Sequence, residues 1–448
     1  MARLFGTDGV RGIANEKLTS KMAYDLGRAG AFCLTDEVHN AKILIGKDTR
    51  VSGDMLESAL VAGICSAGAD AVVACTLPTA AIAYLTRHSG YDAGVVISAS
   101  HNTVEYNGIK FFNSNGYKLA DEIEDRIEAI ILQDAEEIPQ PTGKKIGRRV
   151  RLKKAAQDYI DFVVESTDVS LEGLKVVLDC ANGAASEVAP WIFKLLGAEV
   201  IPYYNLPDGT NINENCGSTH PDQLSRLVSE LGADIGLAFD GDADRLIAVD
   251  EHGNIVDGDK IMTICAMDMK RRGVLKKDTV VATVMSNMGM EMTLKENGIK
   301  LVRSDVGDRY VLEEMIKDGY NLGGEQSGHV IFLDQNTTGD GILTGVALMS
   351  VMKREDKPLA RLARKVQIYP QVLVNAVVKE ERKHDYNKDE EILAAMKKLE
   401  NKFAGQGRVL IRTSGTEPLV RVMIEGKDKE AITKQAVSIA KLIEQRLG

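Results

Sequence analysis

The sequence predicts an α/β protein with three similar α/β domains, each built on a mixed sheet, around a central cleft, and a C-terminal α+β domain. Strand-like runs of β-branched residues alternate with amphipathic, helix-like runs along most of the 448 residues, a pattern typical of α/β units. That length exceeds what one compact core holds. A similar block recurs three times, and the tail follows a different pattern. The expected domains are 1–155, 156–255, 256–368 and 369–448.

Each of the three blocks is expected to end in a polar, glycine-containing loop that follows a buried strand. The first block runs from AKILIGKDTR through a helix over 53–67 to the strand GVVIS and the loop ASHN. The second runs from LKVVLDCANGA to DIGLAFD and GDADR, and the third from DTVVATVMSN to YNLGGEQSGH. Ligands of open α/β sheets bind outside the carboxyl ends of the strands. The loops of Ser100, Asp240 and Glu325 are therefore expected to share one cleft.

The tail from about Tyr369 predicts the small α+β domain. YPQVLVNAVV is followed by a charged helical stretch, the strand pair GRVLIRTSGTEPLVRVMIEG and a last helix that ends at Gly448. The order is β-α-β-β-α. The Lys- and Glu-rich segment 379–402 is interpreted as a solvated helix face and its connecting loop, without a function of its own.

Composition limits the partners. The formal net charge is -10, which argues against a nucleic acid or an anionic membrane, because both favour a basic face. A local Arg and Lys cluster can still bind a small anion. The chain begins without an apolar signal segment and holds no run long enough to span a membrane, so a cytoplasmic protein is expected, with monomer and homodimer left open. Its six cysteines form no C-x-x-C pair and are interpreted as reduced structural thiols.

The segment DGDADR predicts a metal site. Asp240, Asp242 and Asp244 alternate on a short turn after an apolar strand, and three close carboxylates repel one another unless a cation compensates. Oxygen ligands at this density suit Mg²⁺. The alternatives are an acidic surface turn and a calcium loop, but the glycine and final glutamate of the 12-residue calcium pattern are absent. Arg245, next in the chain, is suited to meet phosphate oxygens.

The segment ISASHN contains a candidate phosphate carrier. Small neighbours leave the Ser100 hydroxyl accessible, and no Gly-x-Ser-x-Gly elbow surrounds it, which disfavours acyl transfer. A phosphoserine would match a metal and an arginine; a helix cap is the equally weighted alternative. His101 is more often a structural hydrogen-bonding residue in such a setting. Lys110, in NGIKFF, is a candidate general base or phosphate contact, or else a plain surface lysine.

Two further loops could hold a sugar phosphate. In GGEQSGH, Glu325 and Ser327 could bind neighbouring sugar hydroxyls, and a glycine-rich turn is the alternative. In RTSGTEP, a Ser-Gly-Thr turn between arginines suits phosphate oxygens, although a surface hairpin has the same pattern. Near the N-terminus Arg11, Lys47 and Arg50 either line the same cleft or pair with carboxylates.

FGTDGVRG, SASHN, DGDADR, GEQSGH and RTSGTEP, in this order, resemble the α-D-phosphohexomutase family over essentially the whole chain. The resemblance implies that Ser100 is the phosphoserine and that Asp240, Asp242 and Asp244 bind magnesium together with its phosphate. It implies that Glu325 and Ser327 hold the sugar hydroxyls. The phosphate that is not reacting would be held by Arg412, Ser414, Gly415, Thr416 and Arg421. It also implies a C-terminal domain that moves to close the cleft.

The implied reaction has two steps. Phospho-Ser100 gives its phosphate to the 1- or 6-hydroxyl of a sugar monophosphate, and the bisphosphate reorients and returns its other phosphate to Ser100. Arg245 would offset charge during transfer. Lys110, His101 and His329 are the candidates for moving the hydroxyl proton.

Within the family, SASHN, NGIKFF, GSTHP, VGDRYV and GEQSGH most resemble bacterial members that interconvert glucosamine 6-phosphate and glucosamine 1-phosphate. The resemblance therefore implies these substrates, on the way to UDP-N-acetylglucosamine and peptidoglycan. Glucosamine 1,6-bisphosphate or glucose 1,6-bisphosphate is the expected activator. Mannose or glucose phosphates are the nearest alternative substrates. A metal-dependent sugar phosphatase and a non-catalytic sugar-phosphate sensor are the alternatives of other classes.

The sequence departs from the family pattern at three positions. Thr103 and Thr413 stand where the family usually has proline, and Ala243 stands where the metal loop usually has glycine. Thr103 could loosen the loop behind Ser100. Ala243 asks more of the backbone if its φ is positive. None of the three removes a ligand or the nucleophile.

Overall fold

The computed structural model describes residues 3–6, 8–35, 41–403, 407–414 and 417–448. It divides into two compact units. The first comprises Met1–Met285 with Ile299–Arg364, and the second Ser286–Gly298 with Lys365–Gly448.

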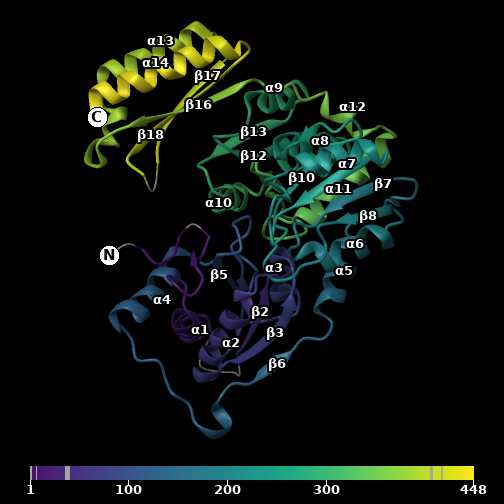
Figure 1. Cartoon of the computed structure of the whole chain (residues 1–448), viewed down its shortest axis with the longest axis vertical. Helices are drawn as coiled ribbons and strands as arrows, with labels where there is room; N and C mark the ends of the chain where they lie inside the picture. The colour runs from purple at the N-terminus through teal and green to yellow at the C-terminus, as the bar shows by residue number, and fades with distance from the viewer. Residues whose placement is uncertain (1–2, 7, 36–40, 404–406, 415–416) are drawn as a thin grey trace. The chain divides into compact units, whose positions relative to one another are not determined.

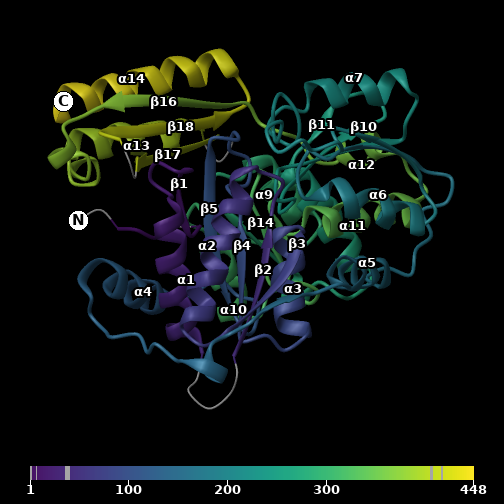
Figure 2. The same cartoon turned by 60° about the horizontal axis from the view of Figure 1, so that its bottom comes forward.

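The first unit contains three mixed sheets (Figures 1 and 2). The six-stranded sheet has the order β1-β5-β4-β2-β3-β6. Strands β2, β3, β4 and β6 run parallel to one another, whereas β5 pairs antiparallel with both β4 and β1. Its strands are β1 (Val10–Ile13), β2 (Lys42–Lys47), β3 (Asp70–Thr76), β4 (Ala93–Ile97), β5 (Tyr106–Asn113) and β6 (Arg149–Arg151).

The other two sheets repeat the central pattern of the first. The five-stranded sheet has the order β11-β10-β9-β7-β8, and the four-stranded sheet has the order β13-β12-β14-β15. Their strands are β7 (Lys175–Asp179), β8 (Glu199–Tyr203), β9 (Ile235–Phe239), β10 (Leu246–Asp250), β11 (Ile255–Val256), β12 (Thr279–Thr283), β13 (Lys300–Ser304), β14 (Leu322–Gly324) and β15 (Val330–Phe332).

In every block the first strand pairs parallel with the second and the third, and the fourth strand returns antiparallel beside the third. The three blocks of mixed sheet predicted from the sequence are therefore confirmed, with one topology used three times. The third strands β4 and β9 are buried at every residue, which explains why both read as continuous apolar runs rather than alternating ones.

Helices of the first unit connect these strands. Several start with a side-chain cap; Thr19, for example, accepts a hydrogen bond from the Met22 amide, as N-cap residues do. The helices are α1 (Ser20–Leu34), α2 (Ser52–Ser66), α3 (Thr79–His88), α4 (Asp121–Gln133), α5 (Ala155–Glu165), α6 (Ala185–Leu195), α7 (Asp222–Glu230), α8 (Gly258–Arg271), α10 (Asp308–Asp318), α11 (Gly341–Glu355) and α12 (Leu359–Ala363). Short 3-10 turns cover Gly143–Lys145 and Lys276–Asp278.

The second unit is an α+β domain, as predicted. Its antiparallel sheet has the order β16-β18-β17, and α13 and α14 lie along one face of it (Figure 1). Alternate strand residues such as Ala376, Val422 and Ile411 pack against Ile392 and Ile443 of these helices. Its elements are α9 (Met288–Glu296), β16 (Gln371–Val377), 3-10 turns Glu380–Arg382 and Asp385–Asn387, α13 (Glu390–Phe403), β17 (Gly407–Thr413), β18 (Leu419–Gly426) and α14 (Lys429–Leu447). In the parts of the chain that are described, no helix is long and apolar enough to cross a membrane.

Candidate active site

The three predicted loops occupy equivalent places in the three sheets of the first unit. Ser100 lies between β4 and β5, Asp240 follows β9, and Glu325 follows β14. Each loop thus joins the third strand of its block to the antiparallel fourth. Two of the loops are joined through the backbone, because Arg245 forms a β-bridge with His329. The Leu246 amide also donates to the Gly328 carbonyl at 3.0 Å.

Asp240, Asp242 and Asp244 form a buried carboxylate cluster. One oxygen of each lies within 4.8 Å of the others, and their exposed fractions are 1%, 0% and 6%. Burial, together with the charges of Asp244 and Asp242, raises the pKa of Asp240 well above its usual range. A cation bound between these oxygens would compensate the repulsion and keep all three carboxylates ionised.

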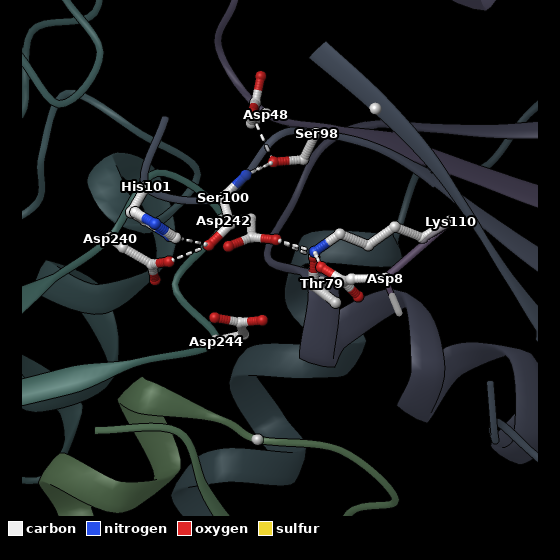
Figure 3. Close-up of polar contacts among 12 residues, drawn as sticks. Asp8, Asp48, Thr79, Ser98, Ser100, His101, Lys110, Asp240, Asp242 and Asp244 are labelled. Atoms are coloured by element: carbon white, nitrogen blue, oxygen red, sulfur yellow. Dashed lines mark hydrogen bonds and ion pairs between the residues drawn. The ribbon is translucent and has the colours of Figure 1, made fainter. Parts of the chain in front are cut away.

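The remaining contacts of the cluster leave oxygens free for that cation. Thr79 Oγ1 and Lys110 Nζ donate to Asp242 Oδ2 at 2.7 and 2.8 Å (Figure 3). The Oδ1 atoms of Asp242 and Asp244 are buried and accept no hydrogen bond from the described residues. An all-oxygen donor set with unsatisfied buried oxygens fits a hard divalent ion such as magnesium.

Ser100 contacts this cluster directly. Its Oγ donates to Asp240 Oδ2 at 2.5 Å and lies 3.3 Å from His101 Nδ1 (Figure 3). The residue is 2% exposed, and its φ is 52°. Left-handed backbone is uncommon for a serine. Burial and the positive charges of Arg245 and Arg11 lower the pKa of His101 to about 4, so its ring is neutral near pH 7.

Lys110 is a buried lysine rather than a surface one. Its Nζ lies between Asp242 Oδ2 at 2.8 Å and Asp8 Oδ2 at 3.0 Å. Burial alone would lower the pKa of Lys110, but the Asp242 and Asp8 carboxylates raise it above its ordinary value. The ammonium therefore stays charged at neutral pH, which suits a phosphate contact better than a general base.

His329 meets the cluster from the other side. Its Nδ1 lies 3.5 Å from Asp244 Oδ2 and its Nε2 3.4 Å from Asp308 Oδ2. The Gly339 amide donates to Nε2 at 3.0 Å, which favours the neutral tautomer with its proton on Nδ1. Burial would lower the pKa of His329, but Asp244 and Asp308 raise it. The resting ring is nevertheless neutral, because an imidazolium Nε2 could not accept the hydrogen bond from the Gly339 amide.

A chain of alternating acidic and basic side chains links both sides of the cluster, and we call it the charge ring. Lys118 Nζ lies 2.6 Å from Asp8 Oδ1 and 2.5 Å from Asp308 Oδ2. The ring therefore runs through Asp242, Lys110, Asp8, Lys118, Asp308, His329 and Asp244. The chain closes into a ring because its first and last members, Asp242 and Asp244, lie in the same loop.

Arg245 and the loop of Glu325 and Ser327 lie at the edge of the cluster. Arg245 Nε lies 3.8 Å from Asp244 Oδ1, and the side chain is 24% exposed. Glu325 is half-buried and its charge acts on Arg245, while Ser327 is exposed. Arg11 pairs with Asp8 and is also partly exposed. These side chains can reach a ligand from the cluster's rim.

Lys47 and Arg50 follow the second of their two predicted alternatives and pair with carboxylates. Lys47 Nζ lies 2.5 Å from Asp54 and 2.8 Å from Glu57. Arg50 Nε lies 2.9 Å from Asp48, and both side chains are fully buried.

The predicted phosphate-binding residues lie in the second unit. Arg412 of β17 and Arg421 of β18 are direct cross-strand partners, and the Nε of each is buried without a hydrogen-bond partner among the described residues. Arg421 Nη2 lies 3.5 Å from Ser414 Oγ and 3.3 Å from Glu417. Burial and Arg421 lower the pKa of Arg412. Like charges placed opposite each other are unfavourable, which an anion would reverse. Gly415 and Thr416 lie outside the described residues.

The three departures from the family pattern have different surroundings. Ala243 is fully buried with a φ of 57°, so the position does use left-handed backbone. Thr103 is exposed, and its carbonyl accepts a hydrogen bond from Arg50. Thr413 ends β17 opposite Val420.

Sequence reasoning missed several residues of this site. Asp8 and Asp308 lie within the quoted segments FGTDGVRG and VGDRYV but were not singled out there. Thr79 and Lys118 carry no local pattern, because their partners are 163 and 190 positions away. Only the paired geometry identifies them.

Comparison with known proteins agrees with this geometry. Four family models for phosphoglucomutase/phosphomannomutase match in order: domain I over residues 2–138, domain II over 157–253, domain III over 257–369 and the C-terminal domain over 373–442. The chain belongs to this α-D-phosphohexomutase family.

Relatives of full length narrow the position within the family. The chain is 61% identical to phosphoglucosamine mutase of Caldanaerobacter subterraneus subsp. tengcongensis and 60% identical to that of Thermoanaerobacter sp. (strain X514), each over 100% of both chains. The phosphoglucosamine mutase of Clostridium novyi (strain NT) is 58% identical over 100% of this chain and 99% of its own. The chain therefore groups with the phosphoglucosamine mutases among the phosphohexomutase isomerases.

Solved structures share the fold. A phosphoglucomutase/phosphomannomutase family protein from Burkholderia thailandensis has a TM-score of 0.80 at 25% identity, over 98% of both chains. Aspergillus fumigatus N-acetylphosphoglucosamine mutase, in complex with GlcNAc-6P and magnesium, has a TM-score of 0.70 at 16% identity, over 99% of this chain and 96% of its own.

Proposed function

We propose that the protein interconverts glucosamine 6-phosphate and glucosamine 1-phosphate through a phosphorylated Ser100 and a sugar bisphosphate. The observation that carries the proposal is the 2.5 Å contact of Ser100 Oγ with a buried carboxylate cluster. Identity of 58–61% to phosphoglucosamine mutases supports the choice of sugar. We expect it to act in the cytoplasm, with a sugar 1,6-bisphosphate as its activator.

Asp240, Asp242 and Asp244, together with Ser100 or its phosphate, would hold magnesium. The unsatisfied Oδ1 atoms of Asp242 and Asp244 support this donor set, and one solved relative is described in complex with magnesium. The ion supplies charge neutralisation for the transferring phosphoryl group when it is bound.

The side chains of this chain divide the remaining work. Lys110 and Arg245 hold positive charge beside the transferring phosphate, and both keep it because nearby carboxylates raise the pKa of each. His101, neutral and 3.3 Å from Ser100 Oγ, can accept the proton of the attacking hydroxyl. His329, which carries its proton on Nδ1 beside Asp244, is the second candidate and would act as a proton donor.

Substrate would be held by two groups of side chains. Glu325 and Ser327 would accept and donate hydrogen bonds to the sugar hydroxyls, and Arg11 would contact phosphate at the rim. Arg412, Ser414, Gly415, Thr416 and Arg421 would bind the second phosphate. A separate site for that phosphate allows the bisphosphate to turn while one of its ends stays bound.

The test combines turnover with site mapping. Purified protein is mapped for phosphate at Ser100 before and after glucose 1,6-bisphosphate, and turnover of glucosamine, mannose and glucose 6-phosphates is compared in the presence of Mg²⁺. We expect phosphate at Ser100 and the highest kcat/KM with glucosamine 6-phosphate. Steady phosphate release without isomer would instead indicate a phosphatase, and binding without turnover a sensor. Preference for mannose or glucose phosphates would overturn the choice of sugar.

A further inference from the structure

The backbone of Ser100 is held in an unfavourable conformation by residues outside its own loop. Its φ of 52° lies in a region that costs a non-glycine residue about 1–2 kcal/mol. Such a conformation persists only where the surroundings determine it several times over. The contacts around the carbonyls of Ser100, Asn102 and Thr103 do so.

Arg50 supplies most of these contacts. Its Nη2 donates to the carbonyls of Ser100 and Asn102 at 3.0 and 2.7 Å, and its Nη1 donates to the carbonyl of Thr103. Its Nε donates to Asp48 at 2.9 Å. The guanidinium is fully buried, so each of its bonds is made in a medium where an unpaired carbonyl would be costly.

Asn213, from the second block, binds two of the same carbonyls. Its Nδ2 donates to Ser100 O and Asn102 O at 2.9 Å each. Gly241 of the metal loop also packs here, because a Cβ at that position would lie 2.6 Å from Ser100 O. The Ser100 carbonyl is therefore enclosed by two donors and by the metal loop.

Asp48 completes the arrangement on the amide side. The Ser100 amide donates to Ser98 Oγ at 2.9 Å, and that hydroxyl donates to Asp48 Oδ2 at 2.6 Å (Figure 3). Asp48 thus connects the Arg50 guanidinium with the Ser100 amide. The two peptide groups on either side of the Ser100 Cα are thus both tied to one buried ion pair, Arg50 with Asp48.

We infer that Arg50 and Asn213 form a carbonyl clamp that keeps Ser100 left-handed and aims its Oγ at Asp240. They are positioning residues, since neither touches the reacting oxygen. Lysine cannot replace Arg50, because one ammonium cannot reach three carbonyls and a carboxylate in a fixed plane. The catalytic consequence rests on the proposed function, whereas the conformational one does not.

The experiment uses the full-length protein with the substitutions Arg50→Lys and Asn213→Gly. Glycine accepts the φ of 57° at position 213, and the substitution removes the side-chain amide that donates to the Ser100 and Asn102 carbonyls. Asn215→Gly is the matched control, because Asn215 has a φ of 53° and is exposed. Three quantities are measured: melting temperature, kcat and KM with glucosamine 6-phosphate, and hydrogen exchange of the peptide covering residues 99–104.

We expect Asn213→Gly and Arg50→Lys to exchange faster over 99–104 and to lose about 10- to 100-fold in kcat, since a displacement of about 1 Å can cost that much. KM should change less than threefold, and Asn215→Gly should match the parent protein. Arg50→Lys is the more disruptive variant. If it does not fold, Asn213→Gly alone tests the carbonyl clamp. Folded variants with parental kcat and parental exchange would overturn the clamp. Absence of turnover in the parent would reject the proposed function and leave exchange as the test of the clamp.

Discussion

The Ser100 cluster of the first unit and the arginine pair of the second both place like charges close together, but they compensate them differently. Around Asp242 and Asp244 the fold itself supplies countercharges, through Lys110 and Arg245. Across β17 and β18, Arg412 faces Arg421, and each keeps a buried Nε without a partner among the described residues.

The difference indicates which part of the reaction each region serves. A transferring phosphoryl group needs charges that are already positioned, because reorganisation during transfer raises the barrier. A phosphate that must bind and leave needs donors that become satisfied only in the complex. The first region therefore resembles a preorganised reaction centre, and the second an anion site completed by its ligand.

The largest effect is expected from a substitution that removes the phosphate carrier but leaves every charged side chain of the first region in place. Ser100→Ala should lower mutase turnover by at least about 1000-fold, because the covalent route is lost. The measurement is glucosamine 1-phosphate formation with Mg²⁺ and glucose 1,6-bisphosphate. Stabilisation of the variant by Mg²⁺ should persist, which separates loss of the carrier from loss of the metal site. Full turnover would reject the two-step scheme.

The next prediction separates the metal from the countercharges. Mg²⁺ at about 100 times its Kd should raise the free energy of unfolding of the parent protein by about 2.7 kcal/mol. Asp242→Asn should lose most of this gain, because it removes the negative charge of one of the three carboxylates that would bind the ion. It also leaves Lys110 without its closest carboxylate. Thermal unfolding with EDTA, Mg²⁺ and Ca²⁺ measures it. An equal response of parent and variant would place the cation elsewhere.

A smaller effect is expected in the second region, and of a different kind. Arg421→Gln should raise KM for glucosamine 6-phosphate about 10- to 100-fold with little change in kcat, since one charged hydrogen bond contributes about 1.5–3 kcal/mol. The same substitution should raise the free energy of unfolding without ligand by a few tenths of a kcal/mol, because it removes the repulsion with Arg412. A loss of stability together with unchanged KM would contradict the anion site. Steady-state kinetics and urea unfolding provide the two values.

The smallest effect concerns Ala243. Glycine would relieve about 1–2 kcal/mol of left-handed strain, but it would also lose about 0.8 kcal/mol of methyl burial and about 0.4–1 kcal/mol through the freer unfolded chain. Ala243→Gly should therefore leave the melting temperature nearly unchanged and kcat within twofold. Ala243→Val, which adds branching at the same φ of 57°, should destabilise clearly. A large gain in kcat for the glycine variant would mean that alanine distorts the metal loop.

The repeated α/β blocks and the carboxylate cluster could be predicted because their causes are local. Buried strands such as β9 are written as continuous apolar runs, and Asp240, Asp242 and Asp244 stand two residues apart. The α+β fold of the tail could also be predicted, because alternate residues of its strands, such as Val422, are apolar and face the core.

The charge ring and the carbonyl clamp could not be predicted for the opposite reason. Lys118 meets Asp308 across 190 positions, and Asn213 meets Ser100 across 113. Separations of this length leave no recognisable pattern in the sequence, so neither pair can be identified from it. The left-handed backbone of Ser100 is likewise a product of these distant contacts, because serine has no such preference of its own.

The charge ring also has a consequence for how the protein is made. Lys118 pairs with Asp308, Asn336 donates to the carbonyl of Ala80, and Thr337 donates to that of Gly116. The first block therefore emerges from the ribosome long before Asp308, Asn336 and Thr337, the residues that form these contacts with it. Lys118 must wait for 190 further residues, and the carbonyls of Ala80 and Gly116 must wait for 256 and 221. Contacts of such long range form slowly. Truncation after the second block should yield a chain that holds its first sheets but depends on chaperones for solubility.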